Sequence, residues 1–124
     1  MAQTKSFVDT LGVYGRTADD GTARLELDAT EEHLNEAGTV HGGVLATLVD
    51  TAMGQAVRSR TGAGDVPATS QLTVTYLRPG RPGRLQATGR VSKQGDHLTV
   101  CEADVEQDGR ALVHAVATFA VLHT

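Results

Sequence analysis

The segment from about His41 to Arg60 is the one stretch whose pattern predicts a long helix. Its apolar residues recur every three or four positions, which places them on one face of a helical backbone. We expect Thr39 to cap the start of this helix, and Gly62 and Gly64 to follow its end. A single helix of this length has to bury its apolar face against another layer of secondary structure, and the rest of the chain has to supply that layer.

Strand-like patterns fill most of the remaining chain. Before the helix, Thr22 to Asp28 alternates apolar and polar residues. Four further strands are expected after it, over residues 68–77, 84–93, 97–106 and 111–122, separated by turn residues. A short helix is expected over residues 5–11, and a loop or short helical turn over residues 31–38. The order predicts an α+β fold: one long helix packs on a curved antiparallel sheet whose last four strands form a meander.

The bulk properties indicate one soluble domain covering residues 1–124. The single cysteine, Cys101, excludes an intrachain disulfide, and its strand pattern predicts a core residue rather than a nucleophile. The five histidines show no metal-ligand spacing, so we expect no metal. Neither a secretory signal nor an apolar window of about 20 residues is visible, and a cytoplasmic location is the default expectation.

A lone carboxylate, Asp50, interrupts the apolar helix. The small residues Gly43, Ala46 and Gly54 flank it on the same helical face, so a slender substrate or another backbone could approach it. Glycine inside a helix costs about 1 kcal/mol relative to alanine, so Gly54 indicates a close approach. The alternative is a surface carboxylate on a solvated face. We favour a functional acid. Burying a charge is costly, so a lone carboxylate on an otherwise apolar helix needs a reason to be there.

The helix starts at His41-Gly42-Gly43, where backbone N–H groups lack helical partners and the helix dipole is positive. Such an end can stabilise an oxyanion. Taken alone, His41 could be satisfied by the backbone, and the two glycines could form a tight entry turn. Together with Asp50, the segment indicates carbonyl chemistry: the helix start polarises the carbonyl, and the acid attacks it or activates water.

The spacing of Gly42 and Asp50 constrains how they can act together. Eight residues separate them, which is roughly 12 Å along a helix. Reacting groups have to lie within about 3–3.5 Å of each other. The two groups can therefore act on one carbonyl only if they come from different subunits. The sequence predicts a dimer with two antiparallel helices and two shared sites.

Charge is unevenly distributed along this acidic chain, whose net charge is −4. The segment from Val66 to Gly95 contains no Asp or Glu but holds five cations: Arg78, Arg81, Arg84, Arg90 and Lys93. This distribution favours an anionic ligand with a defined docking place. Nucleic acid is a poor candidate, because the negative net charge of the whole chain repels phosphate. The alternative is a solvated strand edge whose charges discourage aggregation.

The ordered motif Asn35-x-x-Gly38-x-x-His41-Gly42-Gly43, followed by Leu48-x-Asp50-x-Ala52-x-Gly54, resembles the hotdog-fold acyl-CoA thioesterases of the PaaI type, the phenylacetate-pathway group. The later segments Thr75-Tyr76-Leu77-Arg78-Pro79 and Gly83-x-Leu85 also resemble that family. The resemblance implies a hotdog fold, with a curved antiparallel sheet wrapped around the long helix. It also implies homodimers that pair into tetramers.

The resemblance further implies a role for each motif residue. The Gly42 N–H would polarise the thioester carbonyl, with Asn35 and His41 lining the same end of the site. Asp50 of the partner subunit would act as general base on water or as nucleophile, and the sequence leaves both routes open. Thr69 matches the position of a hydroxyl residue near the acid and would orient the water. Its alternative interpretation is an ordinary strand threonine.

The resemblance also implies a role for the basic segment. Coenzyme A carries a pyrophosphate and a 3′-phosphate, and arginine binds phosphates well. By resemblance, the substrate-binding residues are Gly43, Arg78, Pro79, Arg81, Arg84 and Lys93. No separate cofactor is implied, since coenzyme A is part of the substrate. The resulting expectation is hydrolysis of an acyl-CoA, with aryl-acetyl, hydroxybenzoyl, hydroxynaphthoyl or medium-chain acyl groups all open. The alternatives are a non-catalytic acyl-CoA-binding protein and, with less support, a hotdog dehydratase.

Overall fold

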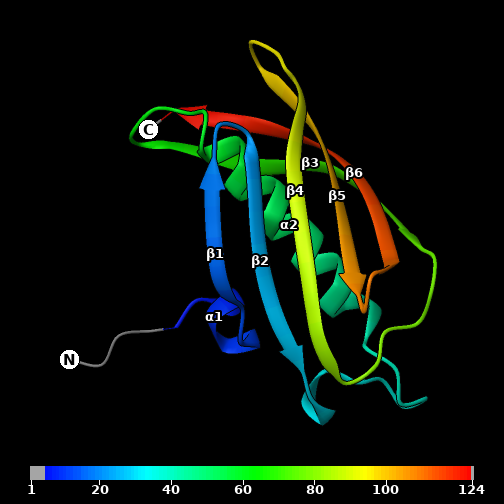
Figure 1. Ribbon diagram of the computed structural model, residues 1–124. Coiled ribbons are helices and arrows are strands. Elements are labelled where there is room, and N and C mark those ends of the chain that lie inside the picture. The colour runs from blue at the N-terminus through cyan, green and yellow to red at the C-terminus, as the bar shows by residue number, and fades with distance from the viewer. Residues whose placement is uncertain (1–4, 124) are drawn as a thin grey trace.

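The computed structural model describes residues 5–123, which form one sheet and one long helix (Figure 1). The elements in chain order are α1 (Phe7–Leu11), β1 (Tyr14–Asp19), β2 (Thr22–Ala29), the 3-10 helix η1 (Glu31–His33), α2 (Gly42–Arg58), β3 (Asp65–Tyr76), β4 (Gly83–Gln94), β5 (Leu98–Gln107) and β6 (Arg110–His123). The six strands form a single antiparallel sheet that curves around α2. The expected α+β hotdog architecture is confirmed.

The expected meander is wrong, because β3 and β4 are not neighbours. The strand order is β1-β2-β4-β5-β6-β3, so β4 pairs with β2 while β3 pairs with β6 at the edge of the sheet. The segment 77–82 carries the chain from that edge to the middle of the sheet, as Figure 1 shows. This segment contains Pro79 and Pro82 and is too long for the two-residue hairpin that would have kept the strands adjacent.

The strand β1 was not expected from the sequence. All six of its residues are exposed, so it has no alternation of apolar and polar residues to reveal it. It forms a hairpin with β2 through Asp20 and Gly21, which both have positive φ angles, of 44° and 85°. Backbone pairing, rather than burial, holds this strand in place.

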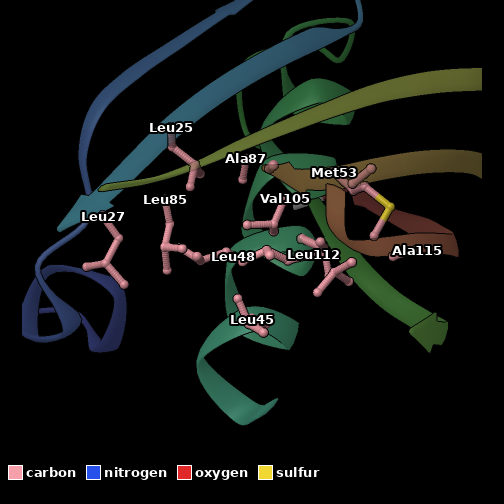
Figure 2. Close-up of a cluster of buried hydrophobic side chains, with 14 of the residues drawn as sticks. Leu25, Leu27, Leu45, Leu48, Met53, Leu85, Ala87, Val105, Leu112 and Ala115 are labelled. Carbon is pink, nitrogen blue, oxygen red and sulfur yellow. The ribbon is translucent and has the colours of Figure 1, made fainter. Parts of the chain in front are cut away.

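The core lies between α2 and the concave face of the sheet, as Figure 2 shows. The helix contributes its predicted apolar stripe: Leu45, Leu48, Val49, Ala52, Met53, Ala56 and Val57 are all buried. Cys101 on β5 is fully buried in this core, and burial raises the pKa of its thiol to about 11. The expectation that Cys101 is a core residue is therefore confirmed.

A glycine on the sheet, Gly89, lets the helix pack closely. A Cβ added there would lie 2.5 Å from the backbone carbonyl carbon of Ala52 in α2. By contrast, a Cβ at Gly54 would meet only the ring of Phe119, at an ordinary 3.5 Å. Within the described chain, the close approach expected at Gly54 is therefore found at Gly89 instead.

Candidate active site

The helix α2 starts at a different cap from the one expected. His41, rather than Thr39, is the N-cap, and its Nδ1 accepts a 2.8 Å hydrogen bond from the Gly43 N–H. An isolated bridge between Leu34 and Val40 keeps the chain extended through Val40, so the helix cannot begin earlier. Thr39 instead belongs to the loop that precedes the helix.

The cap determines which backbone amide is free at the helix start. The Gly43 N–H is occupied by His41, whereas the Gly42 N–H donates to no other residue in the described part of the chain. Because His41 accepts at Nδ1, the neutral imidazole carries its proton on Nε2. The free amide lies at the positive end of a helix of 17 residues, which is a favourable place for developing negative charge.

Asn35 holds the loop that leads into the helix. Its Oδ1 accepts hydrogen bonds from the N–H groups of Ala37 (3.0 Å) and Thr39 (3.1 Å). Its Nδ2 donates to the Thr39 hydroxyl at 2.9 Å. The Asn35 side chain thus fixes the shape of residues 35–39 and lies beside the helix start, as the motif implied.

Tyr76, at the end of β3, contacts the helix start and was not assigned a role from the sequence. Its hydroxyl donates a 2.8 Å hydrogen bond to the Gly42 carbonyl. A Cβ added at Gly42 would lie 3.3 Å from the Tyr76 ring, so the ring covers this glycine closely. The available signal was its position in the Thr75–Pro79 motif and the scarcity of aromatic residues, which make up 3% of the chain.

A surface hollow of about 450 Å³ opens beside the free amide. We call it the amide hollow. It is lined by Asn35, Thr39, Val40, Gly42, Gly43, Leu45, Tyr76, Leu77, Arg78 and Pro79. The structure therefore brings five of the residues expected from the sequence into one place: Asn35, Gly42, Gly43, Arg78 and Pro79.

The acid lies in a second hollow, which we call the acid hollow. Asp50 is partly buried, and its Oδ1 accepts a 2.6 Å hydrogen bond from the Thr69 hydroxyl on β3. The hollow measures about 270 Å³ and is lined by Phe7, Val8, Ala46, Thr47, Asp50, Thr51 and Leu72. Thr69 and Asp50, expected to lie near each other, do so within one chain.

No residue is common to the amide hollow and the acid hollow. Gly42 and Asp50 are eight residues apart on one straight run of helix, roughly 12 Å along its axis. One chain therefore presents an amide without an acid in one hollow, and an acid without an amide in the other. The described chain therefore does not bring Gly42 and Asp50 together in one hollow.

The four candidate cations separate in space. Arg78 lines the amide hollow, and its Nη1 donates to the Ala111 carbonyl at 2.8 Å. Arg81 lines a neighbouring hollow with Arg78. Arg84 is hydrogen-bonded to Glu26, which raises the pKa of the Arg84 guanidinium. Lys93 lies near the opposite end of β4 from Arg84, so these two cations do not belong to one site.

Neither a metal site nor a membrane-spanning helix is found in residues 5–123. No group of three or more His, Cys, Asp or Glu side chains in this range could hold a metal ion. No helix in this range is long and apolar enough to cross a membrane.

Residues 37–114 match the family described as "Thioesterase superfamily". A candidate esterase of Halobacterium salinarum is 45% identical over 101 residues, which make up 77% of this chain and 66% of the relative, just under two thirds of its length. Human acyl-coenzyme A thioesterase 13 is 33% identical over 107 residues, which make up 85% of this chain and 76% of the relative.

Two solved structures share the architecture of this chain. The PaaI protein of the Escherichia coli phenylacetic acid degradation operon matches with a TM-score of 0.85 and 29% identity, covering 93% of this chain and 83% of that one. A hypothetical thioesterase of Streptococcus pneumoniae TIGR4, in a structure with coenzyme A, matches with a TM-score of 0.82 and 29% identity. That match covers 91% of this chain and 88% of the other.

Proposed function

The chain belongs to the thioesterase superfamily, whose members include thioester hydrolases of the PaaI type, and we propose that it hydrolyses acyl-CoA to a carboxylic acid and free coenzyme A. The observation that carries this proposal is the unpaired Gly42 N–H at the positive end of α2, beside a hollow. A thioester carbonyl placed there gains a donor aimed at the oxygen that becomes negative during the reaction.

The active site is shared between two subunits in this proposal. The separation of the amide hollow from the acid hollow supports it, because neither is a complete site alone. The edge strand β3 supports it as well: it has 12 residues and pairs with a neighbour, β6, on one side only. A second copy paired antiparallel along this edge makes the two α2 helices antiparallel. Each helix start then approaches Asp50 of the partner subunit.

The chemistry follows from these two groups. In the general-base route, Asp50 removes a proton from water as the water oxygen bonds to the thioester carbon. The Gly42 N–H of the other subunit stabilises the resulting oxyanion. The tetrahedral intermediate then collapses, the C–S bond breaks, and the coenzyme A thiolate leaves and takes up a proton. In the nucleophilic route, an Asp50 oxygen bonds to the thioester carbon, the C–S bond breaks, and the coenzyme A thiolate leaves and takes up a proton. The resulting mixed anhydride is then hydrolysed by water to the carboxylic acid and free Asp50.

A single turnover in ¹⁸O-labelled water tests for the nucleophilic route in which water opens the anhydride at the Asp50 carbonyl. If Asp50 is the general base, the first carboxylic acid released contains ¹⁸O from water. If Asp50 is the nucleophile and water attacks the Asp50 carbonyl of the anhydride, the first product contains no ¹⁸O, because its second oxygen comes from Asp50, and ¹⁸O enters the Asp50 carboxylate. Mass spectrometry of the product and of the Asp50 peptide reads both results.

The test of the proposed function is hydrolysis of a panel of acyl-CoA substrates, followed by release of free thiol. We expect Asp50→Asn to lower kcat by at least about 100-fold. Asp96→Asn, an exposed substitution of the same chemistry in the turn after β4, is the matched control. Undiminished turnover by folded Asp50→Asn would contradict the proposal. Binding of a non-hydrolysable acyl-CoA without turnover of any substrate would favour the acyl-CoA-binding alternative.

A further inference from the structure

We propose that His33 is a positioning residue for the reaction: its imidazole ties the loop that leads into α2 to the end of α1, and so holds the Gly42 N–H in place. This inference rests on the proposed function and adds a residue that no sequence motif singled out. His33 is the last residue of η1, and its side chain is partly buried.

Both ring nitrogens of His33 bond to backbone groups, and these groups belong to different segments. Nδ1 accepts a 2.9 Å hydrogen bond from the Thr30 N–H. Nε2 donates a 2.8 Å hydrogen bond to the carbonyl of Leu11, which lies 22 residues earlier in the sequence. An N–H can only donate and a carbonyl can only accept, so the two bonds together require the neutral ring with its proton on Nε2. The imidazole therefore links the start of η1 to the end of α1, which lie at the same end of the molecule (Figure 1).

The main chain of His33 carries this link to the start of α2. Its carbonyl accepts a 2.8 Å hydrogen bond from the His41 N–H, so the segment 33–41 is closed at its two ends. His41 is the N-cap that occupies the Gly43 N–H and leaves the Gly42 N–H free. A displacement of His33 would therefore move the cap and, with it, the free amide.

The helix α1 is a suitable anchor because several contacts hold it in place. The Ser6 hydroxyl accepts a 3.1 Å hydrogen bond from the Asp9 N–H and caps the start of the helix. Val8 and Leu11 pack against the core, and the Asp9 carboxylate pairs with Arg16 on β1. The Leu11 carbonyl is therefore a fixed point to which the His33 ring can attach the loop.

The same short helix bounds the acid hollow. Phe7 and Val8 of α1 line that hollow together with Asp50. Because His33 ties α1 to the loop before α2, one imidazole joins the elements that bound the acid hollow and the amide hollow. Loss of the imidazole should loosen both elements and leave the far strands of the sheet unaffected.

The kinetic test compares His33→Leu, which removes both side-chain hydrogen bonds, with His33→Gln, whose amide offers one acceptor and one donor. We expect His33→Leu to lower kcat about 5- to 30-fold with little change in KM, because the Gly42 N–H acts on charge that develops in the transition state. His33→Gln should recover most of the rate. His33→Asn, which keeps an acceptor for Thr30 but is too short to reach Leu11, replaces His33→Leu in this comparison if that variant does not fold.

The matched control is Thr30→Val. It removes the hydroxyl of the capping box at η1 but keeps the backbone N–H that donates to His33. We expect its kcat to stay within about twofold of wild type. A loss as large as that of His33→Leu would overturn the inference, because it would trace the effect to the stability of η1 rather than to the link with α1.

Hydrogen–deuterium exchange measured by mass spectrometry tests the link without catalysis. In folded His33→Leu, peptides covering α1 and residues 33–45 should exchange at least about threefold faster than in wild type, while peptides of β5 and β6 keep their rates. Unchanged exchange in these two segments, or equal kcat values for His33→Leu and His33→Gln, would overturn the inference. Failure of wild type to hydrolyse any acyl-CoA would instead contradict the proposed function, and the exchange rates would still decide whether His33 holds the two segments.

Discussion

The Thr69 hydroxyl donates a 2.6 Å hydrogen bond to Oδ1 of Asp50 and thereby joins the edge strand β3 to the middle of α2. No other side-chain hydrogen bond to Asp50 is found in the described part of the chain. The bond orients one carboxylate oxygen and leaves Oδ2 available to water or to a thioester carbon. This arrangement suits an acid that has to hold one orientation during proton transfer.

Replacement of Thr69 by valine should slow catalysis because the shape is kept while the hydroxyl is lost. We expect kcat to fall about 3- to 10-fold with little change in KM, which corresponds to one hydrogen bond. Thr69→Ser keeps the donor and should recover most of the rate. Steady-state kinetics of both variants provide the measurement, and equal kcat values for them would exclude an orienting role.

Mixed dimers test the shared site. Asp50→Ala removes the acid, and Gly42→Pro removes the free N–H at the first helical position, where proline is tolerated. Each variant alone should be nearly inactive. After subunit exchange, a heterodimer contains one site with both groups intact, so activity should return to as much as about half of the wild-type value per heterodimer.

The control for this experiment is proof of exchange by mass spectrometry of the intact assembly. Absence of recovered activity in a sample that contains heterodimers would show that Gly42 and Asp50 do not act across an interface.

Loss of the Tyr76 hydroxyl should affect the helix start. Tyr76→Phe removes the 2.8 Å hydrogen bond to the Gly42 carbonyl but keeps the ring that covers this glycine. We expect kcat to fall about 3- to 10-fold, because the Gly42 backbone loses this hydrogen bond at its carbonyl and its N–H is then positioned less firmly. Tyr14→Phe is the matched control, since its hydroxyl donates to Asp28 on the neighbouring strand. Identical kcat values for the two variants would refute a positioning role of Tyr76.

Substitution of Gly89 should destabilise the fold. A Cβ at this position would lie 2.5 Å from the backbone of Ala52, and backbone cannot move aside as a flexible side chain can. We expect Gly89→Ala to lower the free energy of unfolding by about 1–3 kcal/mol, as measured by urea titration. Gly54→Ala, where the added Cβ meets a ring at 3.5 Å, should cause no such loss. Unchanged stability of Gly89→Ala would show that the helix and sheet can separate slightly without cost.

The pH dependence of stability should include a contribution from Asp104. Burial works to raise the pKa of Asp104, but hydrogen bonds from His114 and Arg90 outweigh it and lower this pKa below its usual value. An acid with a lowered pKa stabilises the fold above its unfolded pKa of about 3.9, and the contribution is lost as pH falls through the folded pKa.

The measurement is the difference in free energy of unfolding between wild type and Asp104→Asn. This difference should be largest near neutral pH and should shrink as the pH falls below about 4. Asp96→Asn controls for removal of a negative charge. A difference between wild type and Asp104→Asn that stays constant down to about pH 2.5 would contradict the assignment.

The sequence by itself determined the elements with a strong local pattern. The helix predicted from about His41 to Arg60 is α2 over Gly42–Arg58, and the strand predicted over residues 84–93 is β4 over Gly83–Gln94. The prediction is correct for these two elements because each buries one face, so its apolar residues recur along the chain with the period of a helix or of a strand. The same reading placed Asp50 on the helix and, through the rise per residue, predicted that Gly42 lies too far away to share its site.

The tertiary structure decided which distant residues meet. The pairing of β3 with β6, the hydrogen bond from Thr69 to Asp50 and the contact of Gly89 with α2 all join segments far apart in the sequence. The identity of the cap, His41, depended on the bridge that keeps Val40 extended. Local patterns report which face of an element is buried, whereas neighbours depend on chain crossings and packing that no single segment encodes.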